Sequence, residues 1–178
     1  MSTSAVPALA YCGKAPLLAE KVVKSLAARK KMVVGAESCT AGLASDFIAS
    51  IPGASDVFWG CFVTYSADAK VKLLGVQEDQ IEAHGLVSRP VALAMAEGAL
   101  EKSGAFWAFS ITGFAGPSGG SERAPVGTVW IGIAGRDGAS GALRSDAKRF
   151  LFSGSRNEIR EAAAVAALQE VLERVNRA

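Results

Sequence analysis

Residues that could perform nucleophilic chemistry lie in the stretch Glu37-Ser38-Cys39-Thr40, directly after the apolar run VVGA. A serine hydroxyl at a helix N-terminus can cap free backbone amides. The same amides could hold the oxyanion that forms when a serine attacks a carbonyl group. Cys39 competes as the nucleophile, because a helix dipole would stabilise its thiolate. The stretch alone therefore leaves open a helix cap, a serine nucleophile and a cysteine nucleophile.

A serine nucleophile needs a base, and His84 is the only histidine in the chain. His84 precedes a glycine at a predicted helix end, where a histidine is usually structural. A lysine whose pKa is lowered by burial is a common substitute. Tyr65 ends a predicted strand, and Lys70 follows one turn into a helix capped by Ser66, so the lysine can point back toward Tyr65. A solvated lysine and a strand-end tyrosine are the plainer interpretations.

The longest irregular segment, 111–127, holds the glycines Gly113, Gly116, Gly119 and Gly120. Glycine lets backbone amides approach a ligand closely, as in phosphate-binding loops. The segment matches neither a P-loop nor a G-x-G-x-x-G turn, which disfavours a nucleoside triphosphate ligand. About 14 irregular residues in a compact domain nevertheless indicate function.

Apolar periodicity predicts alternating helices and strands, which must position these three loops. Helices are expected over 16–30, 38–50, 66–75, 78–85, 89–102 and 155–178, with a capping box at Ser155 and Glu158. Strands are expected over 31–36, 57–65 and 105–112, followed by a hairpin of 127–135 and 142–152 around Arg136-Asp137-Gly138. This order predicts a three-layer α/β/α fold with a mixed sheet of about five strands. The three loops follow strand carboxyl ends, the usual ligand edge of open α/β sheets.

Composition bounds the class of protein. The 178 residues fit an N-terminal arm, 1–16, and a single domain, 17–178. A net charge of +2 without a basic stripe predicts no nucleic-acid binding. No basic signal-peptide start and no apolar run of roughly 20 residues is seen, so no membrane span is expected.

The three cysteines are odd in number and lack C-x-x-C spacing, which favours a cytoplasmic location over a disulfide framework. With one histidine, neither a metal site nor a cofactor is expected. Exposed aromatic side chains such as Trp59 or Trp107 would suit the interface of a homo-oligomer.

Several ordered motifs together resemble the CinA C-terminal domain family from about Leu17 to the end of the chain. They are AESCTAGL, GCFVTYSADAKVKLLGV, AHGLVS, MAEGA, SITGFAGPSGGSERAPVGTVWIG and FSGSRNEIREAA. Family members of this length are similar to nicotinamide-nucleotide amidases, which convert nicotinamide mononucleotide to nicotinate mononucleotide and ammonia without a metal. The family's longer form adds an N-terminal molybdopterin-binding-type domain, which we do not expect before Leu17.

The resemblance implies a Ser-Tyr-Lys catalytic set, which falls on Ser38, Tyr65 and Lys70. Which of Tyr65 and Lys70 is the immediate base stays open. The small-molecule nucleotide is expected to contact the residues around these three and the glycine loop. These binding residues are Glu37, Cys39, Thr40, Thr112, Gly113, Gly116, Gly119, Gly120 and Arg156.

Two positions depart from the family pattern. Ala41 replaces the first glycine of the usual Thr-Gly-Gly, and we expect it to adopt a helical conformation. Ser155 replaces the aspartate of the usual Gly-Asp-Arg turn but keeps a cap. The alternative function is a non-catalytic, nucleotide-binding regulatory module linked to competence or DNA damage, which would not need Ser38, Tyr65 and Lys70 together.

Overall fold

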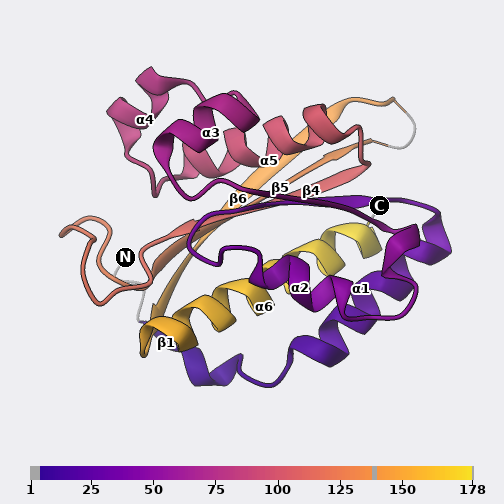
Figure 1. The fold of residues 1–178 in the computed structure, drawn as a ribbon, viewed down its shortest axis with the longest axis horizontal. Helices are drawn as coiled ribbons and strands as arrows, with labels where there is room; N and C mark the ends of the chain where they lie inside the picture. The colour runs from indigo at the N-terminus through magenta and orange to yellow at the C-terminus, as the bar shows by residue number, and fades with distance from the viewer. Residues whose placement is uncertain (1–4, 138–139, 178) are drawn as a thin grey trace.

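The computed structural model describes residues 5–137 and 140–177, in which a mixed β-sheet lies between two layers of helices (Figure 1). The strands are β1 (Val6–Pro7), β2 (Val33–Glu37), β3 (Phe58–Val63), β4 (Trp107–Gly113), β5 (Thr128–Arg136) and β6 (Leu143–Ser153). Their order in the six-stranded sheet is β1-β6-β5-β4-β2-β3. β2 runs parallel to β3 and β4, whereas β5 is antiparallel to β4 and β6. The predicted α/β/α fold is confirmed.

The sheet has one strand more than the five expected, because Val6–Pro7 pairs in parallel with Phe152–Ser153 of β6. A 3-10 helix, η1 (Ala8–Ala10), follows and buries Ala8 completely in the core. The predicted β5–β6 hairpin is confirmed, although Gly138 of its expected turn lies outside the described residues.

Helices lie on both sides of the sheet (Figure 1). One layer holds α1 (Ala15–Arg29), α2 (Leu43–Ala49) and α6 (Arg156–Arg177), and the other holds α3 (Ala67–Leu74), α4 (Glu78–His84) and α5 (Arg89–Ser103). In this second layer, α3 and α4 pack on the outer side of α5. A short 3-10 helix, η2 (Ala54–Asp56), lies between α2 and β3. The helices other than α2 begin and end close to their predicted bounds.

Serine side chains cap α3, α5 and α6 as predicted. Ser66 Oγ accepts a hydrogen bond from Ala69 N at 3.1 Å, and Ser88 Oγ accepts one from Val91 N at 3.4 Å. In the capping box of α6, Ser155 N donates to Glu158 Oε2 at 2.7 Å. Each cap satisfies amides that the first turn leaves without an intrahelical acceptor. The cap at Ser66 matters most here, because it sets where the helix that carries Lys70 begins.

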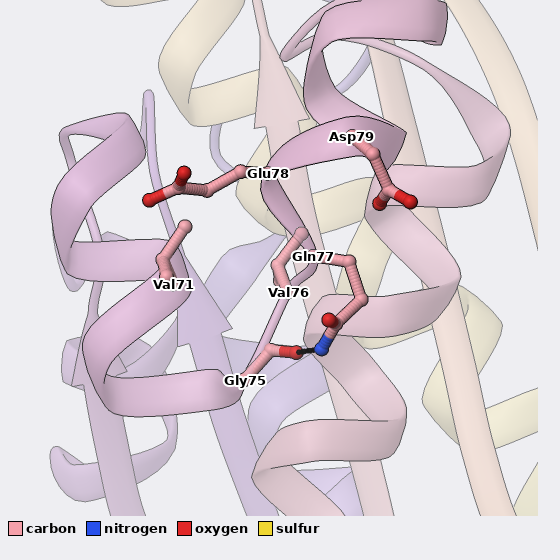
Figure 2. A pocket seen from close by; sticks show the side chains of 6 residues that line it. All are labelled: Val71, Gly75, Val76, Gln77, Glu78 and Asp79. Atoms are coloured by element: carbon pink, nitrogen blue, oxygen red, sulfur yellow. Dashed lines mark hydrogen bonds between the residues drawn. The ribbon is translucent and has the colours of Figure 1, made fainter.

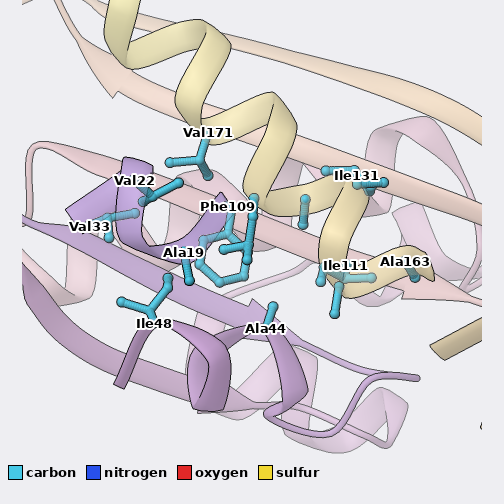
Figure 3. Packing of buried hydrophobic residues seen from close by; sticks show 14 of the residues in the cluster. Ala19, Val22, Val33, Ala44, Ile48, Phe109, Ile111, Ile131, Ala163 and Val171 are labelled. Atoms are coloured by element: carbon cyan, nitrogen blue, oxygen red, sulfur yellow. The ribbon is translucent and has the colours of Figure 1, made fainter. Parts of the chain in front are cut away.

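Successive residues of the central strands point to opposite faces, and the two faces differ in side-chain size. The face toward α1, α2 and α6 carries large residues such as Phe109, Ile111 and Ile131 (Figure 3). The face toward α5 carries small residues, among them Ala36, Ala108, Ser110, Gly132 and Ala134. Small residues let the α5 backbone lie close to the sheet, and Ser110 Oγ donates to Ala92 O of that helix at 2.5 Å.

Both Trp59 and Trp107 were expected to be exposed, and this is confirmed for Trp59 and wrong for Trp107. Trp59 on the edge strand β3 is 45% exposed. Trp107 is 6% exposed, because its side chain points into the core between the sheet and the α1, α2 and α6 layer. It therefore packs inside the domain and is not part of a surface.

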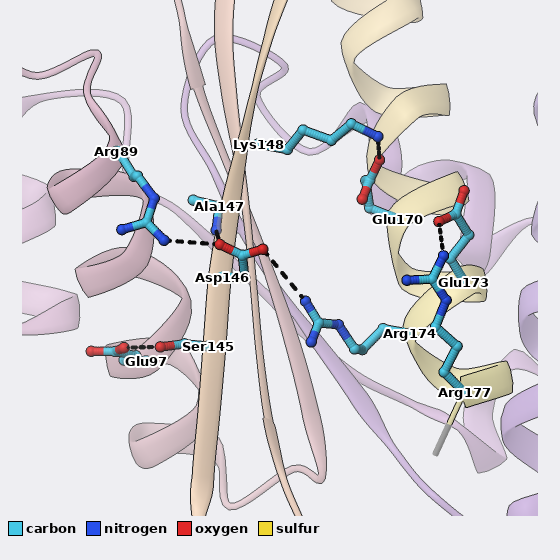
Figure 4. Close-up of polar contacts among 10 residues, drawn as sticks. All are labelled: Arg89, Glu97, Ser145, Asp146, Ala147, Lys148, Glu170, Glu173, Arg174 and Arg177. Carbon is cyan, nitrogen blue, oxygen red and sulfur yellow. Dashed lines mark hydrogen bonds and ion pairs between the residues drawn. The ribbon is translucent and has the colours of Figure 1, made fainter.

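Polar contacts bridge β6 to the helices on both sides (Figure 4). Arg89 of α5 and Lys148 of β6 pair with Asp146 and Glu170 at 2.9 and 2.7 Å. Both cationic side chains are more than half exposed. Surface pairs of this kind contribute about 0–1 kcal/mol each, so the apolar layers hold the sheet and helices together.

The predicted start of α2 is wrong. The helix begins at Leu43 and not at Ser38, and residues 38–42 form turns. The buried carboxylate of Glu37 accepts hydrogen bonds from the backbone amides of Gly42, Ala44 and Ser45, so a tertiary contact from β2 caps the helix. Ala41 is correspondingly not helical but left-handed, with φ of 54°.

Close packing between α3 and α5 depends on a glycine. A Cβ added at Gly98 would lie 2.0 Å from the carbonyl oxygen of Leu74. Alanine at an ordinary helix position is more stable than glycine, but here the α3 backbone would have to move. We expect Gly98→Ala to lower the free energy of unfolding by about 1–3 kcal/mol, the usual cost of overpacking. Chemical denaturation measures this, with Lys102→Ala on the exposed side of α5 as a control that should change stability by less than about 0.5 kcal/mol.

The left-handed conformation of Ala41 can be tested by comparing alanine-to-glycine substitution there with the same substitution at a helical position. Left-handed backbone strains alanine but not glycine, and Ala41 is exposed, so it packs against little. We expect Ala41→Gly to raise the free energy of unfolding by about 0.5–1 kcal/mol. The exposed Ala49, in the last turn of α2, should respond oppositely, because Ala49→Gly loses helix propensity. Equal destabilisation by both changes would contradict the left-handed conformation.

Candidate active site

A cavity of about 200 Å³ lies at the sheet edge where β2, β3 and β4 end. These three strands are parallel to one another, so their carboxyl ends meet at the same edge. The first turn of α6 also reaches the cavity. Its lining residues are Ser38, Cys39, Tyr65, Lys70, Leu86, Val87, Thr112, Gly113, Phe114, Ala115, Gly116, Ser118 and Arg156. The three loops singled out in the sequence therefore converge.

Ser38 and Lys70 are in hydrogen-bonding contact. Lys70 Nζ lies 3.0 Å from Ser38 Oγ and donates to the carbonyl oxygen of Thr64 at 2.6 Å. Ser38 itself is anchored by its backbone amide, which donates to Ile111 O of β4 at 2.9 Å. Lys70 is in the first turn of α3, and its side chain reaches back over the end of β3. The contact joins two residues 32 positions apart and sets an amine against a hydroxyl, the arrangement that a serine nucleophile and its base require.

The Lys70 side chain is buried, with 1% of the residue exposed. Burial penalises the ammonium form and lowers the pKa of Lys70 from 10.5 to about 8, while the nearby Cys39 acts in the opposite direction. None of the lining residues in the described ranges, 5–137 and 140–177, is acidic. A neutral amine, which can accept a proton from Ser38, is therefore accessible near physiological pH.

Tyr65 is 58% exposed and contacts a different partner. Its hydroxyl oxygen accepts a hydrogen bond from Arg156 Nη2 at 2.9 Å, and Arg156 Nη1 donates to Gly116 O at 2.7 Å. Within the described part of the chain, no hydrogen bond joins Tyr65 to Ser38 or Lys70. Tyr65 is thereby tied to the glycine loop at the mouth of the cavity.

The neighbours of Ser38 have different environments. Cys39 lines the cavity, but burial, followed by the charge of Glu37, raises the pKa of its thiol to about 12. Cys39 is therefore a poor nucleophile at neutral pH. Glu37 and Thr40 are fully buried and are not lining residues, although the sequence suggested substrate contacts for both. The Glu37 carboxylate accepts hydrogen bonds from backbone amides at the start of α2, and the Ser45 hydroxyl also donates to it at 2.6 Å.

The remaining candidates divide between cavity and scaffold. Thr112 lines the cavity, but its hydroxyl donates to Leu86 O at 2.8 Å and holds the loop between α4 and α5. Gly113 and Gly116 are lining residues, whereas Gly119 and Gly120 are not. A Cβ at Gly120 would meet the backbone of Ala124 and Val126 at 2.9 Å, so this glycine serves the loop's own folding.

Sequence analysis missed residues that contact the site. Leu86, Val87 and Phe114 contribute apolar lining; they lie within the motifs AHGLVS and SITGFAGP but were not named as site residues. Arg160 was missed as well, although it follows Arg156 by four positions, which places both on one face of α6. Arg160 Nε donates to Cys39 O at 3.1 Å, and its Nη2 donates to Thr40 O at 3.0 Å.

A larger hollow of about 400 Å³ lies where α3 leads into α4, lined by Val71 and residues 75–79 (Figure 2). Its side chains include two carboxylates, Glu78 and Asp79, and Gln77 donates to Gly75 O. The described residues that line it include neither a serine nor a lysine. In residues 5–137 and 140–177, no group of three His, Cys, Asp or Glu residues could hold a metal ion. No helix in the same ranges is long and apolar enough to cross a bilayer.

Known proteins are similar to this chain in sequence and in fold. The model of the CinA C-terminal domain matches residues 16–175. The nicotinamide-nucleotide amidohydrolase PncC of Escherichia coli is 47% identical over 152 residues, which are 85% of this chain and 89% of PncC. A CinA-like protein of Chlorobaculum tepidum is 47% identical over 93% of this chain, but the chain spans only 39% of that protein.

A solved structure agrees with these matches. The crystal structure of the competence/damage inducible protein CihA from Agrobacterium tumefaciens has a TM-score of 0.84 and 36% identity, with 99% of both chains covered. The sequence match and the fold match each extend over nearly the whole length. The chain belongs to the CinA C-terminal domain family.

Proposed function

We propose that this protein is an amidohydrolase that converts nicotinamide mononucleotide to nicotinate mononucleotide and ammonia, with Ser38 as nucleophile. The relative PncC, which matches over most of both chains, carries this activity in its name. The observation that carries the proposal is the 3.0 Å contact between Ser38 Oγ and the buried Lys70 Nζ.

Lys70 is the immediate base in this proposal, and Tyr65 is not. Neutral Lys70 takes the hydroxyl proton as Ser38 Oγ attacks the carboxamide carbon. The protonated lysine then gives a proton to the departing ammonia, which leaves an ester between Ser38 and the nicotinoyl group. Lys70 next takes a proton from water, the hydroxide attacks the ester, and Ser38 recovers its proton. The sum of the steps is amide plus water giving acid plus ammonia.

The oxyanion needs hydrogen-bond donors near Ser38. The backbone N–H groups of Cys39 and Thr40 directly follow the nucleophile, and neither has an oxygen acceptor among the described residues. They are the donors we propose, in the position that the amide after a serine nucleophile takes in other hydrolases.

The cavity also suits an anionic nucleotide. Among the described residues that line it, Lys70 and Arg156 are cationic and none is acidic. Arg156 lies at the mouth, so its guanidinium can pair with the phosphate while the pyridine ring lies deeper, toward Ser38. A volume of about 200 Å³ is below the roughly 300–1,000 Å³ of drug-sized sites. We therefore expect the carboxamide end to enter and the phosphate to stay near the surface.

A non-catalytic nucleotide-binding module is the alternative. Such a module would need the glycine loop and Arg156 but not a lysine buried against a serine. Burying an amine without an acidic partner destabilises the folded state. A module that only binds nucleotide would have no use for such a lysine. This cost favours the enzyme.

The direct test is ammonia release from nicotinamide mononucleotide by the purified protein without added metal. Lys70→Met should lower kcat/KM by a factor of about 10³ or more, because no base remains. Lys72→Met is the matched control, since Lys72 is on the same helix, 70% exposed and paired with Asp68. Ser38→Ala should be as inactive as Lys70→Met. A silent wild-type enzyme would exclude the activity, and an active Ser38→Ala would exclude the nucleophile.

The pKa of Lys70 predicts the pH dependence. With a pKa of about 8, about a tenth of the lysine is neutral at pH 7, so kcat/KM should rise roughly tenfold toward a plateau above pH 8. Below pH 7 it should fall about tenfold per pH unit. Tyr65→Phe should keep this inflection, because Lys70 contacts Ser38 whereas the tyrosine hydroxyl is bonded to Arg156. Loss of the inflection in Tyr65→Phe would transfer the role to Tyr65.

A further inference from the structure

We propose that Arg160 is a positioning residue that holds the turn after Ser38 in the conformation in which its amides bind the oxyanion. This inference rests on the proposed function, because it concerns the same reaction. Arg160 is not among the described residues that line the cavity, and its hydrogen bonds in those ranges go to Cys39 O, Thr40 O and Asn157 Oδ1 rather than to Ser38. Its effect on the reaction would pass through the backbone of the turn.

The turn 38–42 belongs to no helix or strand, so other contacts must fix its peptide planes. The carbonyl oxygens of Ser38, Cys39 and Thr40 each accept a hydrogen bond. Ser38 O accepts from Ala41 N at 3.0 Å, and Thr40 O accepts from Leu43 N at 3.2 Å. Arg160 adds the contacts from outside, with Nε on Cys39 O and Nη2 on Thr40 O. Cys39 O has no other donor among the described residues, so only Arg160 fixes that carbonyl.

Because a peptide unit is planar, the hydrogen bond from Arg160 to Cys39 O also sets the direction of the Thr40 N–H. In a trans peptide unit the C=O and N–H groups point in opposite directions. The N–H of Thr40 shares its peptide unit with Cys39 O, which faces Arg160. This N–H therefore points away from α6 and is left free to bind an anion. The cation on the carbonyl side also polarises the peptide, which strengthens its N–H as a donor.

Two side chains thus hold the turn at opposite ends. Buried Glu37 binds the amides of Gly42, Ala44 and Ser45, and half-buried Arg160 binds the carbonyls before them. A guanidinium suits two successive carbonyls because its donors lie in one rigid plane. Lysine at this position would offer a single point charge and could not hold both peptide planes.

The first experiment separates kcat from KM for Arg160→Ala and Arg160→Lys, by ammonia release from nicotinamide mononucleotide. We expect kcat to fall about 10- to 100-fold in Arg160→Ala, less than or equal to the loss of a whole oxyanion donor. KM should stay within about threefold, because the ground-state substrate does not use the displaced donors. Arg160→Lys should recover only part of kcat. Arg177→Ala on the same helix, with a side chain 77% exposed, is the matched control and should behave as wild type.

The second experiment does not depend on the substrate. Phenylmethanesulfonyl fluoride sulfonylates an activated serine: Ser38 Oγ bonds to sulfur, fluoride leaves and Lys70 takes the hydroxyl proton. Mass spectrometry of the Ser38 peptide gives the labelling rate, and circular dichroism gives the folded fraction and Tm of each variant. Labelling should slow in Arg160→Ala by about the same 10- to 100-fold factor, per folded molecule.

The outcomes distinguish this inference from the function on which it rests. Wild-type labelling without hydrolysis of nicotinamide mononucleotide would exclude that substrate, and the slower labelling of Arg160→Ala would still support the positioning role. Absence of both labelling and hydrolysis in the wild type would overturn both proposals. A lower Tm with unchanged kcat and labelling rate in Arg160→Ala would show a merely structural arginine. A rise in KM alone would place Arg160 in substrate binding and overturn positioning.

Discussion

Burial of the Lys70 amine against Ser38 is the constraint on which the rest of the site depends. An exposed lysine would be charged at neutral pH and useless as a base, so the surroundings must exclude water. The cap at Ser66 sets the start of α3, and Gly98 lets α5 pack directly on the end of that helix. It matters as much that none of the described lining residues is acidic, because a carboxylate beside Lys70 would stabilise its charged form.

The second constraint is that Ser38, the proposed nucleophile, follows a strand and precedes a helix without belonging to either. Five residues make this turn, and its shape comes from partners elsewhere in the chain. Glu37 takes the helix amides, and the first turns of α6 contribute Arg156 to the glycine loop and Arg160 to the turn. One helix thereby connects two of the loops that form the cavity, and a shift of α6 would disturb both.

Much of the fold could be predicted because its signals are local. Apolar periodicity and the serine caps at Ser66, Ser88 and Ser155 lie within a few residues of what they control. The convergence of three loops followed from a rule about parallel strands and needed no coordinates. Ser38, Tyr65 and Lys70 were named on that basis and on resemblance, and all three line one cavity.

The sequence by itself determined the layers, most helix bounds and the set of loops at the ligand edge. Tertiary structure decided the start of α2, the left-handed Ala41, the sixth strand and the partners of Arg156 and Arg160. The physical reason is separation along the chain. Arg156 meets Tyr65 across 91 positions, and Arg160 meets Cys39 across 121. No local propensity encodes such contacts, because they exist only once the sheet has brought its loops to α6.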